Sequence, residues 1–215
     1  MYRIAFLWLS SSLLLACSQN QSAGIPLPYY NEPTFSPIFL TDQSEVSDHI
    51  DHTIGAFEVL NQDSLIITEQ IFKDKIHVAN FIFTSCGSIC PSMTANMKTV
   101  SDYFKKDNSI YFLSFSVTPW IDSPQVLRKY RETNEIHSKN WQFLTGQKAE
   151  IYDLARKSYF AEEDIGFSKD STDFLHTEHF ILVDQTQRIR GIYNGSLALE
   201  MKELIADIET LKTEK

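Results

Sequence analysis

Hydrophobic and polar residues along the chain follow patterns that predict alternating strands and helices. Residues 76–83 (IHVANFIF) are β-branched and aromatic with almost no charge, which predicts a buried central strand. Residues 110–117 (IYFLSFSV) predict a second buried strand for the same reason. Between these strands, apolar residues recur at helical spacing, at Met93, Met97, Val100 and Phe104. We therefore expect a helix within residues 86–104, with Pro91 near its start.

Shorter segments complete the pattern. In chain order, we expect a β-hairpin over 57–67, a short helical turn over 68–72, a helix from Asp122-Ser123-Pro124, an extended piece over 141–144, a helix over 147–158, a strand pair over 180–183 and 189–193, and a helix over 201–211. Strands that alternate with helices imply an α/β fold, with a mixed sheet covered on both faces. That is the arrangement of a thioredoxin-like domain with an N-terminal β-hairpin, and we place this domain at residues 53–215.

The first residues have the layout of a secretory signal peptide. Arg3 is the only charge in residues 1–16, and the apolar run that follows it is shorter than the roughly 20 residues that span a membrane. The sequence Leu14-Leu15-Ala16-Cys17 resembles the lipobox of bacterial lipoproteins, in which the cysteine becomes the new N-terminus and carries acyl chains. Cys17 would then anchor the protein on the extracytoplasmic face of a bacterial membrane. The alternative is a plain signal peptide with an incidental cysteine.

Residues 17–52 are predicted to be a lipidated N-terminus, a tether and an extended segment. The stretch SQNQSAG is small and polar, as a tether should be. Four of the seven prolines follow it, at Pro26, Pro28, Pro33 and Pro37. Because proline disfavours a helix there, we expect this segment to lie extended on the domain surface.

Composition excludes one class of function. The 215 residues are 43% hydrophobic and 22% charged, which is typical of a globular protein. Lysine and arginine number 19 against 28 aspartates and glutamates, so the formal charge is −9. A nucleic-acid-binding protein normally has a basic excess, so we expect no nucleic-acid partner.

Two cysteines remain once Cys17 is assigned to lipidation. Cys86 and Cys90 lie in the sequence FTSCGSICP, directly after the buried strand and at the expected helix start. On a helix, residues four apart share a face, so both sulfurs can meet at one point. Unpaired amides at a helix N-terminus favour negative charge, so both thiols are expected to ionise readily. Such a pair suits Cu(I) or Zn(II) and can also close to a disulfide; the alternative is an inert structural pair.

A third ligand would make this pair a metal site. His176 and His179 precede the expected strand at 180–183, whose entry loop faces the active-site helix start in a thioredoxin-like sheet. Sequence spacing alone does not choose between them. His77 is expected to face out of the sheet, and the other histidines to lie on the surface, at His49, His52 and His137.

Two longer stretches resemble the Sco/SenC family of copper chaperones. They are residues 81–93 (FIFTSCGSICPSM) and 175–184 (LHTEHFILVD), and Arg190-Gly191-Ile192-Tyr193 adds to the match. The resemblance runs from about Leu27 to the C-terminal helix. It implies one copper ion, as Cu(I) or Cu(II), bound by Cys86, Cys90 and His176, because the family has a hydroxyl residue after its histidine. It also implies a Cys86–Cys90 disulfide in the oxidised protein.

The resemblance also implies a recipient, the dinuclear copper centre of cytochrome c oxidase subunit II, or another extracytoplasmic copper protein. This chain has Thr118 where the family commonly has an acid, and we expect Asp122 to act as a helix cap. No proline lies between Thr172 and Val183, where thioredoxin-type oxidoreductases carry a cis-proline, and this favours copper over general disulfide exchange. A thiol–disulfide reductase that keeps the recipient's cysteines reduced is the alternative, and a peroxidase has less support.

Overall fold

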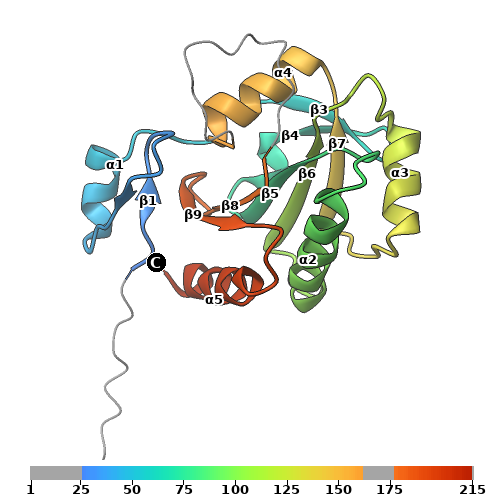
Figure 1. Cartoon of the computed structure of the whole chain (residues 1–215). Helices are drawn as coiled ribbons and strands as arrows, with labels where there is room; N and C mark the ends of the chain where they lie inside the picture. The colour runs from blue at the N-terminus through green and yellow to red at the C-terminus, as the bar shows by residue number, and fades with distance from the viewer. Residues whose placement is uncertain (1–25, 162–176, 215) are drawn as a thin grey trace, which may run out of the picture.

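The computed structural model describes residues 26–161 and 177–214. In chain order its strands are β1 (Tyr29–Tyr30), β2 (Pro37–Ile38), β3 (Glu58–Asn61), β4 (Ile66–Thr68), β5 (Ile76–Ile82), β6 (Ile110–Ser116), β7 (Trp141–Thr145), β8 (His179–Val183) and β9 (Ile189–Asn194). Within the described residues these nine strands form one sheet, in the order β2-β1-β9-β8-β5-β6-β7-β3-β4 (Figure 1). Strands β5, β6 and β7 are parallel, and the other neighbours are antiparallel.

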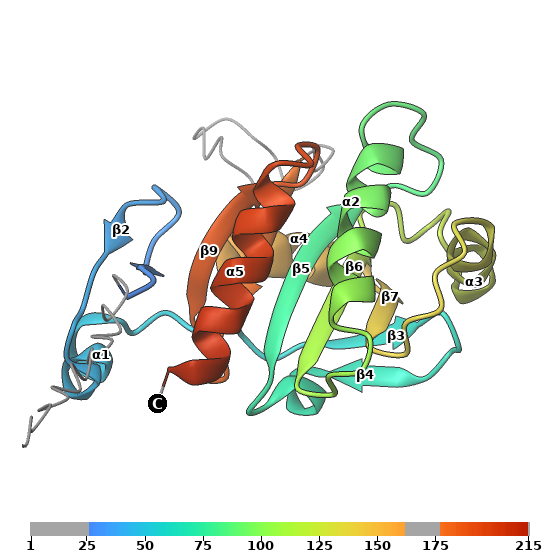
Figure 2. The same ribbon diagram turned by 90° about the horizontal axis from the view of Figure 1, so that it is seen from below.

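Helices cover both faces of this sheet. They are α1 (Val46–His49), α2 (Cys90–Tyr103), α3 (Pro124–Thr133), α4 (Lys148–Asp153) and α5 (Glu200–Thr213), with short 3-10 turns at Gln43–Glu45 and Glu69–Phe72 and a π turn at Leu154–Ser158. Helices α2 and α5 lie on one face and α4 on the other, while α3 lies beside β7 (Figures 1 and 2). In the two described stretches, no helix has the length and apolarity needed to cross a bilayer.

The two strands expected to be buried form the centre of the sheet. All seven residues of β5 are buried, and β5 pairs in parallel with β6, so that Val78 lies opposite Phe112. Val78 belongs to the core under α2 and α5, whereas Ala79 belongs to the core on the face that α4 covers. Burial on both faces explains why β5 lacks the polar alternation of a half-exposed strand. The predicted α/β, thioredoxin-like fold is confirmed.

The predicted hairpin is also confirmed. Strands β3 and β4 pair with Val59 opposite Ile67. The Asn61 side chain closes the turn, because its Oδ1 accepts from the backbone N–H groups of Asp63 and Leu65, each at 2.9 Å. Ser64 takes a left-handed conformation there, with φ of 62°.

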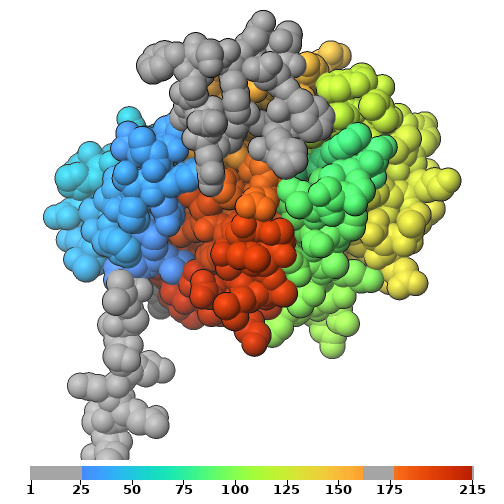
Figure 3. Space-filling view, viewed as in Figure 1, coloured from blue at the N-terminus to red at the C-terminus, as the bar shows by residue number. Residues whose placement is uncertain are grey.

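The proline-rich segment is extended and packs on the domain, as expected. Strand β1 extends the sheet through the pair Tyr30 and Ile189 of β9. Tyr29, Val46 and Ile50 form a small core of their own. Figure 3 shows this N-terminal segment in blue against the red C-terminal region. The boundary between a tether and a domain at residues 52 and 53 stays a prediction.

Candidate metal centre

The two cysteines lie at one end of the central strands. Cys86 is in the loop that joins β5 to α2, residues 83–89, which we call the thiol loop, and Cys90 directly follows it. The backbone N–H of Cys86 donates to the Phe83 carbonyl at 3.0 Å, which closes a turn just after β5. Helix α2 begins only at Cys90, with Pro91 in its first turn. Backbone N–H groups in a first turn have no partner within the helix, so proline, which has no N–H, is favoured there. The expectation that both cysteines share a helix face is therefore wrong. Cys86 belongs to the loop, which projects at the end of the sheet opposite the C-terminus (Figure 2).

The loop nevertheless brings the two sulfurs together. The Cys86 and Cys90 side chains lie close enough for each to shift the pKa of the other. Both thiols are free, with Cys86 partly exposed and Cys90 only 7% exposed. Two adjacent soft donors at an accessible loop fit a copper ion, since thiolate ligands select Cu(I). The Cys86–Cys90 disulfide stays a prediction.

The two thiols differ in acidity. Burial opposes ionisation of Cys86, but hydrogen bonds from the backbone N–H groups of residues 88–90 and from the Cys90 thiol outweigh it and lower the pKa of Cys86. At Cys90, burial dominates and raises the pKa to about 11, and the neighbouring Cys86 adds to the rise. The prediction of easy ionisation is confirmed for Cys86 and wrong for Cys90, because the helix start also buries the Cys90 sulfur.

The predicted third ligand, His176, lies outside the described residues, as does the predicted lipidation site, Cys17. Strand β8 is antiparallel to β5, with Ile181 opposite Ala79, so β8 begins at the end of the sheet where the thiol loop lies. His179 is the first residue of β8, is 9% exposed, and meets the Phe35 ring edge-on at 5.5 Å. In the stretches 26–161 and 177–214, no group of three His, Cys, Asp or Glu side chains is placed to hold a metal ion.

His77 faces out of the sheet, as expected, but α4 and its π turn cover that face and leave His77 1% exposed. The expectation for Asp122 is wrong. Asp122 does not cap α3. The cap is Ser123, whose Oγ accepts from the Val126 N–H at 3.4 Å. The buried Asp122 carboxylate instead accepts from the hydroxyl of Thr84, in the thiol loop.

Sequence reasoning also missed Tyr130 of α3. Its hydroxyl lies 2.7 Å from Thr94 Oγ1 in the first turns of α2. Burial raises the pKa of Tyr130, and the hydrogen bond to Thr94 opposes this, while Cys90 and Cys86 are close enough to add to the rise. No spacing rule links Tyr130 to the cysteines, because only the packing of α3 beside the sheet brings it near them.

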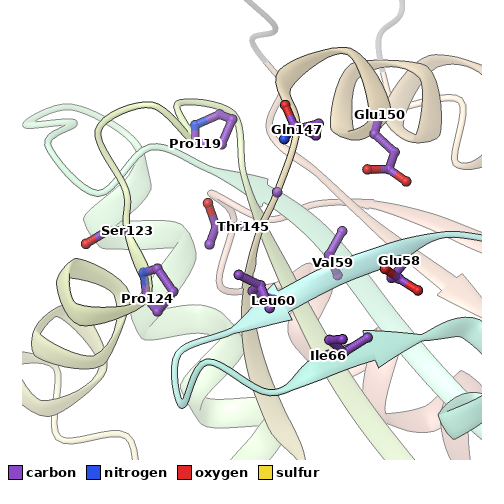
Figure 4. Close-up of a pocket in the computed structure, with 11 residues that line it drawn as sticks. Glu58, Val59, Leu60, Ile66, Pro119, Ser123, Pro124, Thr145, Gln147 and Glu150 are labelled. Carbon is purple, nitrogen blue, oxygen red and sulfur yellow. The ribbon is translucent and has the colours of Figure 1, made fainter.

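An open groove of about 550 Å³ lies between the β3–β4 hairpin and the segments that lead into α3 and α4 (Figure 4). Its apolar lining includes Leu60, Ile66 and Pro119, and two acids, Glu58 and Glu150, lie toward one end. Neither cysteine lines it. The groove is therefore separate from the thiol loop.

Solved structures and a curated relative share this architecture. A "SCO1 protein homolog" of Bacillus subtilis is 31% identical over 173 residues, covering 80% of this chain and 89% of its own. The structure of a SCO1/SenC family lipoprotein from Bacillus anthracis matches with a TM-score of 0.65 and 27% identity, over 75% of this chain and 96% of that one. BsSco, described as a member of the Sco family of cytochrome c oxidase assembly proteins, matches with a TM-score of 0.63 and 30% identity, over 76% of this chain and 95% of that one.

Copper is present in a more distant structure. ScoI of Bradyrhizobium japonicum was solved with copper bound and matches with a TM-score of 0.58 and 22% identity, over 74% of this chain and 99% of that one. At this identity the match supports the fold alone. The sequence profile of the SCO1/SenC family matches residues 46–213. With that profile spanning most of its length, and with a relative 31% identical over 80% of it, the chain belongs to the SCO1/SenC family.

Proposed function

We propose that this protein is a copper chaperone that binds one copper ion through Cys86, Cys90 and His176. The observation that carries the proposal is the pair of free, neighbouring thiols in an accessible loop. Two thiolates hold Cu(I), and an imidazole nitrogen as third ligand lets the site hold Cu(II) as well. A site open on one side allows the ion to leave by exchange of ligands with a recipient.

The acidity of the two thiols supports this role. Metal binding requires deprotonated sulfur, and backbone N–H groups lower the pKa of Cys86 despite its partial burial. Cys90 gives up its proton less readily because it is buried. Copper, which strongly favours thiolate over thiol, would supply the free energy for that second deprotonation, so loading would release protons.

The recipient is proposed from the relatives. BsSco, which is 30% identical to this chain, is described as belonging to a family of cytochrome c oxidase assembly proteins. We infer delivery to the dinuclear copper centre of cytochrome c oxidase subunit II, or to another extracytoplasmic copper protein. The similar protein of Bacillus anthracis is a lipoprotein, which supports lipidation of Cys17 and a position on the extracytoplasmic face of a bacterial membrane.

Metal loading tests the proposal directly. The reduced protein is expected to bind one copper per chain, with a sulfur-to-copper charge-transfer band in the Cu(II) form. Replacing either cysteine by serine should abolish that band. His176→Ala should weaken Cu(II) binding more than Cu(I) binding, because two thiolates still hold Cu(I). Equal Cu(II) affinity in the alanine variant and the unmodified protein would show that His176 is not a ligand.

The unequal thiols favour a second candidate, a membrane-anchored thiol–disulfide reductase. Cys86 is the more acidic and more exposed thiol, so its thiolate would attack a disulfide of the recipient and form a mixed disulfide. Cys90 would then displace the recipient's thiol and close the Cys86–Cys90 disulfide. Replacing His176 separates the two functions, since a reductase tolerates His176→Ala and a copper carrier does not.

A further inference from the structure

A buried carboxylate lies beside the thiol loop and has no part in the copper proposal. Asp122 follows β6 and precedes α3, and its exposed fraction is 0%. Carboxylates are seldom buried completely, because an ionised group that loses water needs compensating hydrogen bonds or cations. The partners of Asp122 therefore indicate its role.

Hydroxyl groups from two segments converge on this carboxylate. Ser116 Oγ and Thr118 Oγ1 donate to Asp122 Oδ2 at 2.6 and 2.9 Å. The Thr84 hydroxyl donates to the other oxygen, Oδ1, and the Thr84 backbone N–H lies 3.5 Å from Oδ2. Within the described part of the chain these partners are hydroxyl and amide groups, and none is a cation. These donors contact both carboxyl oxygens, so they fix the orientation of the Asp122 side chain.

Asp122 is itself held in place. The backbone N–H groups of Ile121 and Asp122 donate to the Thr118 carbonyl at 2.8 and 2.9 Å. The next residue, Ser123, caps α3. The carboxylate therefore projects from a closed turn between β6 and a helix start, and not from a free loop.

Thr84 connects this carboxylate to the thiols. It directly follows Phe83, whose carbonyl accepts from the Cys86 N–H at 3.0 Å and whose backbone lies close enough to Cys90 to lower the pKa of its thiol. Both cysteines therefore depend on the position of the backbone at Phe83. Fixing the adjacent Thr84, through its hydroxyl and its N–H, restrains that backbone.

We propose that Asp122 is a positioning residue for the thiol pair, which acts through Thr84 to hold the turn that the Cys86 N–H closes on the Phe83 carbonyl. It touches neither sulfur. The inference rests on the proposed function only for its choice of the thiols as the reactive groups. Loss of the hydrogen bonds to Asp122 would leave both cysteines present but the donors to Cys86 less well aligned.

The test measures the rate at which iodoacetamide modifies Cys86 in the reduced full-length protein at one fixed pH, with the modified site identified by mass spectrometry. Asp122→Asn keeps the size of the side chain and removes its charge. Thr84→Val removes the hydroxyl and leaves the carboxylate. Both variants are expected to react at least about threefold more slowly than the unmodified protein, because a less stabilised thiolate is less populated. Thr84→Ser, which restores a hydroxyl, should recover the original rate.

The control is Asp107→Asn. Asp107 also accepts from a hydroxyl and a backbone N–H, those of Ser109 at 2.5 and 3.0 Å, but it lies before β6, at the opposite end of that strand from Asp122. Its replacement should leave the rate unchanged. Faster reaction in Asp122→Asn would mean that the carboxylate acts on the thiol only as a repelling charge, and would overturn the proposal. An unchanged rate in Thr84→Val would also overturn it, and this variant decides the question if Asp122→Asn does not fold.

The outcome is independent of copper. Iodoacetamide reacts with the thiolate whether or not the protein carries metal, so slow variants would support the role of Asp122 even if the unmodified protein failed to bind copper. Conversely, a protein that binds copper with normal stoichiometry but shows no effect of Thr84→Val would retain the proposed function and lose this inference.

Discussion

Nε2 of His77 lies 3.0 Å from the hydroxyl oxygen of Tyr159, and both side chains are buried in the core beneath α4. Burial lowers the pKa of His77 to about 3 and raises the pKa of Tyr159. The folded protein therefore holds a neutral imidazole over most of the acidic range, although a histidine in the unfolded chain takes up a proton near pH 6.5.

This pair predicts a loss of stability in acid. Since the folded pKa is depressed, the contribution of His77 is complete above about pH 6.5 and falls as the pH drops toward 3, because only the unfolded state binds the proton. The loss is on the order of 2 kcal/mol at pH 5. His77→Gln, which keeps a polar partner for Tyr159, should flatten the dependence of the unfolding free energy on pH between 6.5 and 4. The exposed His49 provides the control, and an equal flattening in His49→Gln would refute this assignment.

The two thiols should react at different rates. Cys86 is the more exposed and has a lowered pKa, while Cys90 is buried with a pKa of about 11. Near pH 8 the reduced protein is expected to be alkylated at Cys86 at least about tenfold faster than at Cys90, because thiolate is the reactive species. Mass spectrometry of the modified peptides measures both rates. Equal rates would mean that the difference in burial and pKa between the two thiols does not govern their reactivity.

Arg190 should be important for stability. Its side chain is 2% exposed and pairs with Asp184 at 3.2 Å and Glu214 at 2.7 Å, and it lies 3.9 Å from the Tyr29 ring centre. It also donates to the carbonyls of Leu27 and Pro28, which ties the N-terminal segment to β9. Removing one partner of a buried ion pair leaves uncompensated charge, so we expect Arg190→Met to lower the free energy of unfolding by about 3 kcal/mol or more.

Urea unfolding measures that effect, and Lys157 offers the matched control. The Lys157–Asp153 pair is exposed on both sides, and Lys157→Met should change stability by less than about 0.5 kcal/mol. Limited proteolysis provides a second measurement, since Arg190→Met should also expose the segment around Leu27 to cleavage. A small effect at Arg190, similar to that at Lys157, would mean that the buried network contributes little.

Two glycines should respond in opposite ways to alanine. A methyl group at Gly195 would overlap the buried ring of Phe180. A methyl group at Gly87, in the thiol loop, would have no atom within 4 Å. Gly195→Ala is expected to destabilise the fold by about 1–3 kcal/mol, because a close-packed core has no room for the extra carbon. Gly87→Ala should leave thermal unfolding nearly unchanged. Tolerance of Gly195→Ala would show that the Phe180 ring can move aside.

Local patterns in the sequence were enough to predict the order of the elements and the position of the cysteine pair. Residues 76–82 were identifiable as a central strand because a strand buried on both faces has few polar residues, and this makes a nearly continuous apolar run in the sequence. Met93, Met97 and Val100 marked the buried side of α2 because a helix repeats its contacts every three to four residues. The hairpin over 57–67 and the helix start near Pro91 were equally local, so adjacent residues were enough to predict them.

The difference between the two thiols, and the contacts that hold them, depend on how distant segments pack together. Cys86 and Cys90 look equivalent in FTSCGSICP, yet the fold buries one sulfur and surrounds the other with amides. Asp122 resembled a helix cap because Pro124 follows it closely, and its bond to Thr84 spans 38 positions of the chain. Burial and hydrogen bonding between distant segments depend on how the parallel strands bring their ends together. Residues adjacent in the sequence do not indicate which distant residues will lie close in space.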